Sequence, residues 1–139
     1  MSPNTIFWPM IAQAALTFAI YALMSRRRIA AIKAGKAKPS QFRENRDEPE
    51  ESLFARNSLT NQFELPVLFF AVVLALHATN AANIITVVLA WFFVLSRYFH
   101  AWIHVTTNRI RYRRPAFVVG FVVLALLWIW LALRIAGLV

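Results

Sequence analysis

Four long apolar stretches constrain this chain more than any other feature. They cover residues about 5–25, 55–78, 84–105 and 115–136. Each approaches or reaches the ~20 residues that a helix needs to cross a bilayer. Because spanning helices satisfy their own backbone hydrogen bonds, the pattern predicts an all-α, integral membrane four-helix bundle formed by a single domain over residues 1–139. With 60% of its residues hydrophobic, the chain has more apolar surface than a soluble domain can hide.

Basic residues gather at one end of the predicted bundle. Nine of the fifteen Lys and Arg lie in 26–56 and five in 97–114, whereas the connection 77–83 has none. The positive-inside rule therefore places this end in the cytoplasm and both termini on the non-cytoplasmic side. The connection 29–51 is expected on the cytoplasmic surface, partly ordered by its own charges. Basic residues at helix ends without interleaved exposed aromatics favour contact with membrane lipid over nucleic-acid binding.

The first apolar stretch has the flanks of a retained anchor. No charged residue precedes Ile6, and the basic run "SRRR" (25–28) follows the apolar residues instead of preceding them. A cleaved signal peptide has the opposite order. We therefore expect this stretch to remain as the first span.

The second stretch carries polar side chains in its first half. Asn57, Asn61, Glu64 and Leu68 follow the spacing i, i+4, i+7 and i+11, which is one face of a helix. Buried amides and carboxylates need partners, so this face is expected to point away from lipid. Pro66 lacks a backbone N–H and predicts a kink inside the helix.

The third stretch ends in a second polar face. The residues at i, i+3, i+7, i+11 and i+14 are Arg97, His100, His104, Asn108 and Arg111. Pro115 is placed to open the fourth helix. Because the second and third helices run in opposite directions, the two polar faces are expected to meet at the basic end of the bundle.

Glu64 is the only acidic residue outside 44–51, and it has two explanations. An ion pair with Arg97 or an arginine of 109–114 would lower the cost of its burial and fix the packing of the helices. A ligand site explains the pattern equally well. The surplus of arginine favours an anionic ligand with several carboxylates, because guanidinium binds carboxylates bidentately.

His100 and His104 have the i, i+4 spacing of metal ligands. No third ligand is at a sensible position and the chain has no cysteine, so ordinary hydrogen bonding is favoured and no metal site is predicted. A proton pathway lined by Glu64, His100 and His104 is a further alternative. The sequence has no Ser/His/Asp order, glycine-rich phosphate loop or carboxylate pair, which disfavours nucleophilic hydrolysis and nucleotide chemistry.

Taken together, the motifs resemble one family over nearly the whole chain. "SRRR" closes the first span, N-x-x-E followed by proline opens the second ("NQFELPVLFF", 61–70), and R-x-x-H-x-x-x-H leads to an arginine cluster after the third. This order resembles MAPEG proteins, the membrane-associated proteins in eicosanoid and glutathione metabolism, and "NQFELPVLFF" is most similar to bacterial members. Members that act on eicosanoids usually carry tyrosines where this chain has His100 and His104.

The resemblance implies a homotrimer in a bacterial inner membrane, with glutathione (or another low-molecular-weight thiol) bound between neighbouring subunits near the cytoplasmic face. It implies a transferase or peroxidase that acts on a lipophilic electrophile. By position in the family motifs, the thiol-binding residues are Arg26, Arg27, Asn61, Glu64, Arg97, His100 and His104. The arginine that stabilises the thiolate corresponds first to Arg113 and second to Arg109. The alternative is a non-catalytic protein of the same fold that binds lipid or serves as an accessory subunit of a larger membrane complex.

Overall fold

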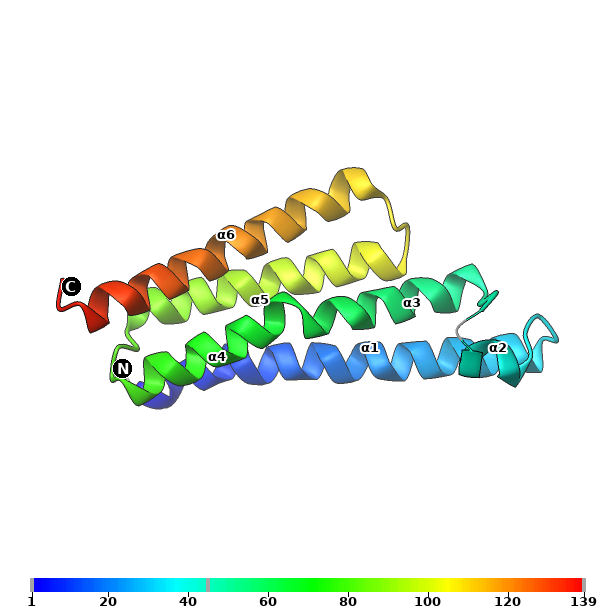
Figure 1. Ribbon diagram of the computed structural model, residues 1–139, viewed down its shortest axis with the longest axis horizontal. Coiled ribbons are helices and arrows are strands. Elements are labelled where there is room, and N and C mark those ends of the chain that lie inside the picture. Colours follow the sequence, from blue (N-terminus) through cyan, green and yellow to red (C-terminus); the bar gives the residue numbers. More distant parts are fainter. Residues whose placement is uncertain (1, 45, 139) are drawn as a thin grey trace.

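The computed structural model describes residues 2–44 and 46–138 as an all-helical bundle. Its elements are η1 (Pro3–Ile6), α1 (Phe7–Lys33), α2 (Pro39–Glu44), α3 (Glu50–Thr60), η2 (Asn61–Phe63), α4 (Leu65–Ala78), α5 (Ile84–Val105) and α6 (Ile110–Ile135). In this part of the chain, four helical segments are long and apolar enough to cross a membrane: Asn4–Lys33, Glu50–Ala78, Ile84–Val105 and Ile110–Ile135. The predicted four-span fold is therefore confirmed. Figure 1 shows the long helices side by side, with both termini at one end of the bundle.

The apolar core lies in the half of the bundle nearer the termini. Phe69 on α4 and Phe93 on α5 are fully buried and stack with their ring centroids 4.4 Å apart. Leu76 on α4 and Leu127 on α6 are also fully buried in this cluster. A second, smaller apolar cluster of Leu16, Ile20, Leu59 and Ala101 lies beside the polar side chains of the other half.

The second span is broken near Pro66, where the sequence predicted a kink inside one continuous helix. Helix α3 passes into the short η2 turn, and Glu64 separates η2 from α4 with φ −98° and ψ −107°. Pro66 is the second residue of α4. At that position the missing N–H costs little, because the first N–H groups of a helix have no intrahelical partner.

The prediction that Pro115 opens the fourth helix is wrong. Helix α6 begins at Ile110, with Pro115 inside it, where the proline ring removes one backbone donor. Helix α5 has already ended at Val105, so Asn108 and Arg111 do not continue its polar face. Asn108 has a positive φ of 49°, a conformation that asparagine tolerates. Because of that turn, the residue spacing of α5 does not continue into α6.

The long connection is ordered around Glu48. The Glu48 side chain is 1% exposed and accepts hydrogen bonds from Arg28 Nε at 2.8 Å and Nη2 at 3.1 Å. Arg56 Nη1 on α3 lies 3.2 Å from the same carboxylate. Burial raises the pKa of Glu48, but hydrogen bonds from Arg28 and Ser52 and the two guanidinium charges outweigh it, so the pKa is lowered. Glu48 thus ties the connection to α1 and α3.

Candidate functional site

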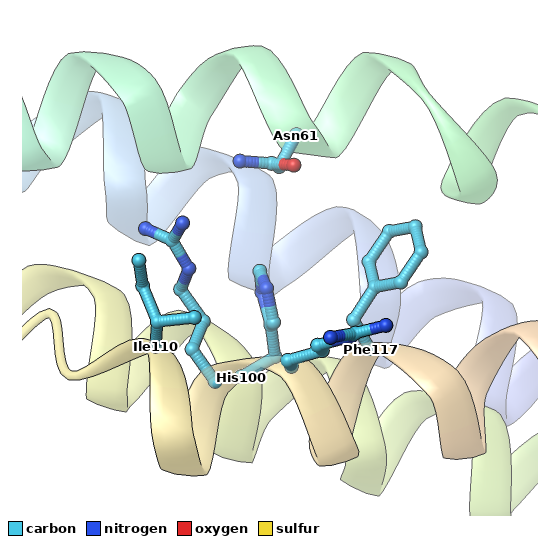
Figure 2. Close-up of a pocket in the computed structure, with 6 residues that line it drawn as sticks. Asn61, His100, Ile110 and Phe117 are labelled. Atoms are coloured by element: carbon cyan, nitrogen blue, oxygen red, sulfur yellow. The ribbon is translucent and has the colours of Figure 1, made fainter.

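A cavity of about 290 Å³ lies between the broken second span and the helices α5 and α6. Its lining residues are Asn61, His100, Ile110, Arg113, Arg114 and Phe117. Figure 2 shows the Asn61 amide on one side of this cavity, facing His100, Ile110 and Phe117. None of the described residues that line it is acidic, so the cavity has a positive local charge.

Helix α6 supplies most of the lining. Ile110, Arg113, Arg114 and Phe117 follow i, i+3, i+4 and i+7 and share one helical face. Arg113 is oriented by its Nη1, which donates a hydrogen bond to the Asn108 side-chain oxygen. The turn that ends α5 therefore also positions an arginine of α6 beside the cavity.

Arg97 on α5 does not line the cavity but contacts two residues that do, Asn61 and Phe117. It is 0% exposed, and its Nη2 donates to the Asn61 carbonyl oxygen at 3.1 Å. Its Nε and Nη1 are buried without a hydrogen-bond partner in the described part of the chain. The guanidinium carbon lies 6.0 Å from the Phe117 ring centroid. A buried cation with two unused donors is costly and has capacity for an anionic ligand.

The two histidines of α5 stand next to Arg97. His100 and His104 are both 3% exposed, and their ring centroids are 5.7 Å apart. The Asn61 side-chain nitrogen lies 3.5 Å from His104 Nδ1, whereas His100 Nδ1 has no partner among the described residues. The second and third spans therefore meet through Asn61, as predicted, whereas Asn57, Glu64 and Leu68 of the same predicted face are exposed in the single chain. The described residues contain no group of three or more His, Cys, Asp or Glu that could hold a metal ion.

The four other predicted residues, like Arg97 and His104, lie outside the cavity lining. Glu64 is exposed at the break in the second span and forms no ion pair within residues 2–44 and 46–138. Arg26 is exposed on α1. Arg27 donates to the carbonyl oxygens of Glu51 and Val105, both at 2.8 Å. Arg109 lines a separate recess between α5 and α6.

Three lining residues were not identified from the sequence: Ile110, Arg114 and Phe117. Their i, i+4 and i+7 spacing on the face of Arg113 is the signal that identifies them. That signal applies only if the fourth helix begins at Ile110. With the helix expected to begin at Pro115, the first two residues fell in the connection.

Comparison with known proteins gives one match. The family model described as MAPEG family matches residues 6–133, which is most of the chain. No curated protein and no solved structure matches.

Proposed function

The chain belongs to the MAPEG family, and from this premise we propose that it is a membrane-bound glutathione transferase or peroxidase that acts on a lipophilic electrophile. The family is associated with glutathione use in general. Four helices long and apolar enough to span a membrane make it an integral membrane protein. The substrate would reach the cavity from the lipid in which its apolar part dissolves.

The observation that carries this proposal is the unused donor capacity of Arg97. Its Nε and Nη1 are buried without a partner among the described residues, and its guanidinium contacts Asn61 and Phe117, which line a cavity with Arg113 and Arg114 in its wall. Glutathione has two carboxylates, and guanidinium groups bind carboxylates through paired, charge-assisted hydrogen bonds. The residues present therefore fit a small anionic thiol peptide, and Asn61, His100 and His104 add neutral polar contacts.

Bound glutathione would supply a thiol as the nucleophile. In this chain, Arg113 is the residue proposed to favour the thiolate, because a nearby guanidinium stabilises the anion. It lines the cavity and is oriented by Asn108, whereas Arg109 lines the other recess. The geometry therefore favours Arg113 over Arg109 for this role.

The proposed assembly is a homotrimer with the site completed by a neighbouring subunit. Glu64 is a carboxylate within a membrane span and is exposed in the single chain, a costly position in lipid. A neighbouring subunit would cover it, and the ammonium group of the γ-glutamyl residue would neutralise it. Arg26, exposed on α1, and Arg27 would then bind ligand carboxylates across the same boundary.

The proposed location is the bacterial inner membrane with the basic end in the cytoplasm. The connection between α1 and α3 and the connection between α5 and α6 carry or border nearly all the basic residues, at the end opposite the termini. The positive-inside rule then places the thiol site toward the cytoplasm.

The proposed activity is tested by conjugation of glutathione to chlorodinitrobenzene, with reduction of cumene hydroperoxide as the peroxidase assay. We expect turnover by the wild type and a loss of at least about tenfold in kcat/KM for Arg113→Gln, with partial recovery in Arg113→Lys because the charge is kept. Lys33→Gln, which removes a charge from an exposed residue that does not line the cavity, is the control. No turnover with either electrophile, or equal rates in Arg113→Gln and wild type, would contradict the proposal.

The alternative is a non-catalytic MAPEG-fold protein that binds lipid or joins a larger membrane complex. It is favoured by the bond from Arg97 to the Asn61 carbonyl, which ties α5 to the broken second span and is a sufficient structural role. This alternative predicts that glutathione gives no thermal protection at any concentration.

A further inference from the structure

A second recess lies between α5 and α6, on a face of α6 different from the one that lines the thiol cavity. It consists of two adjoining spaces of about 300 and 370 Å³ that share Phe99 and Tyr112 as lining residues. Val119 contributes to the first space and Trp102 to the second. The two spaces together form an apolar groove, which we name the α5–α6 groove.

The groove results from where the two helices touch. A Cβ built on Gly120 would lie 2.7 Å from Ser96 Oγ, so α5 and α6 are in close contact at this point. From there the helices separate toward the connection at 106–109 (Figure 1). Ala116, one turn from Gly120, is too small to fill the space that opens between them. Helix packing at one glycine thus leaves a cleft toward the basic end.

The mouth of the groove is positively charged. Arg109 lines it and is the residue immediately before α6, so it lies at the end of a membrane span. Its side chain is exposed and has no hydrogen bond or ion pair within the described ranges 2–44 and 46–138. Trp102 and Tyr112, both exposed, lie beside it. Aromatic residues and arginine at the end of a span are typical of the depth of lipid headgroups.

We propose that the α5–α6 groove binds one anionic phospholipid, with an acyl chain against Phe99 and Val119 and the phosphate on Arg109. The chemistry of the groove matches such a molecule at both ends, since apolar walls lie within the spans and an unpaired guanidinium lies at the mouth. A second copy of the chain is a poorer match. The acidic residues of the chain lie only in 44–51 and at Glu64, which leaves few partners for Arg109. This inference does not depend on thiol chemistry.

The test measures lipid retained by the detergent-purified protein in native mass spectrometry, after incubation with phosphatidylglycerol or phosphatidylcholine of identical acyl chains. We expect the wild type to retain phosphatidylglycerol preferentially. Arg109→Gln is expected to reduce that preference about fivefold. The matched control, Lys36→Gln, removes a charge from an exposed residue at the same end and should keep the preference.

A second variant tests the acyl-chain part of the groove. Val119→Trp fills the space from a side chain that is 50% exposed, so the fold should tolerate it, and retention of phosphatidylglycerol should fall while Arg109 is intact. Equal effects of Arg109→Gln and Lys36→Gln would overturn the proposal, because they would show general charge attraction. Unchanged retention of phosphatidylglycerol in Val119→Trp would also overturn the proposal. So would a result in which Arg109→Gln or Val119→Trp changes the oligomer mass but leaves the preference for phosphatidylglycerol unchanged.

Discussion

At the scale of single residues, Arg97 is the side chain with the most unusual environment. It is fully buried within a span, and only Nη2 has a hydrogen-bond partner in the described part of the chain. Burying a cation with unused hydrogen-bond donors costs free energy. An ionisable residue inside a membrane span is therefore more typical of a ligand site than of a purely structural contact. The proposed thiol site explains why that cost persists.

The first prediction concerns Arg97→Met. Losing the charge-assisted bond to the Asn61 carbonyl costs about 1.5–3 kcal/mol, whereas removing a desolvated charge offsets this. We therefore expect the melting temperature of the ligand-free protein in detergent to change by only a few degrees. The rise in melting temperature caused by glutathione should disappear. A collapse of the ligand-free protein would instead identify Arg97 as a structural clamp.

Residue spacing predicted that Asn61 meets the polar face of the third span, but not that Asn57 and Glu64 stay exposed in the single chain, nor how Arg97 pairs. Asn61, His100 and His104 lie together because helical period fixes which residues share a face. The partner of Arg97 is a backbone carbonyl of Asn61, which the turn at η2 makes available. No spacing argument indicates that bond, because it depends on the dihedral angles at the break.

At the scale of elements, interruptions and close contacts of the helices determine where the cavities lie. The break at Glu64 turns Asn61 toward α5, and the end of α5 at Val105 lets α6 present Arg113 to the same space. Four spans follow from apolar length alone. The first residue of α6 could not be predicted in the same way. Proline is a strong signal for the start of a helix, and only the turn at Asn108, which depends on tertiary context, shows that α6 begins before Pro115.

The second prediction tests the contact at Gly120. Gly120→Ala would force Ser96 Oγ away from the Phe93 carbonyl, to which it donates at 2.6 Å. We expect a net destabilisation of about 1 kcal/mol. In a Ser96→Ala background the same change should be neutral or stabilising, because the nearest Ser96 atom would then be its Cβ at 3.8 Å and alanine has the higher helix propensity. Melting temperatures of the four proteins form a double-mutant cycle, and additive effects would refute the contact.

The third prediction tests the ordering of the long connection by Glu48. Because its folded-state pKa is lowered, the stability from Glu48 is fully present above the unfolded-state pKa and is lost as the pH falls through the folded-state pKa. Glu48→Gln should therefore lower the melting temperature at neutral pH, at a cost of about 1–3 kcal/mol.

The pH dependence of that difference is the decisive readout. Wild type and Glu48→Gln should differ by a constant amount above the pH range in which an ordinary glutamate titrates, and should converge only as the pH falls below that range, because the pKa of Glu48 is lowered. Glu44→Gln, whose exposed carboxylate pairs with Arg43, is the matched control and should change little. A difference independent of pH would exclude the ionised carboxylate as the cause.

At the scale of the whole molecule, the distribution of charge and the position of the termini are the basis of the proposed orientation. Both termini lie at one end of the bundle and the long connection lies at the other (Figure 1). The sequence predicted this arrangement because an even number of spans returns the chain to its starting side. The neighbouring subunits that would cover Glu64 are not determined by helical periodicity, which describes one chain at a time.

The fourth prediction uses the absence of cysteine from the chain. Lys36→Cys in the long connection and Leu138→Cys near the C-terminus are each the only thiol in their variant. A membrane-impermeant maleimide should label Leu138→Cys on intact spheroplasts and Lys36→Cys only after lysis. The reverse pattern would invert the proposed orientation, and labelling of both from outside would contradict the four-span topology.

The proposal that the polar cavity, completed by Glu64 at the subunit boundary, binds a thiol peptide is tested by calorimetric titration of the detergent-purified protein with glutathione at neutral pH. Glu64→Gln is titrated alongside, and the oligomer mass of both proteins is measured as the control for assembly. We expect binding heat in the wild type, and loss of that heat in Glu64→Gln with the assembly intact. Absence of heat and of thermal protection in the wild type, or unchanged binding in Glu64→Gln, would contradict it.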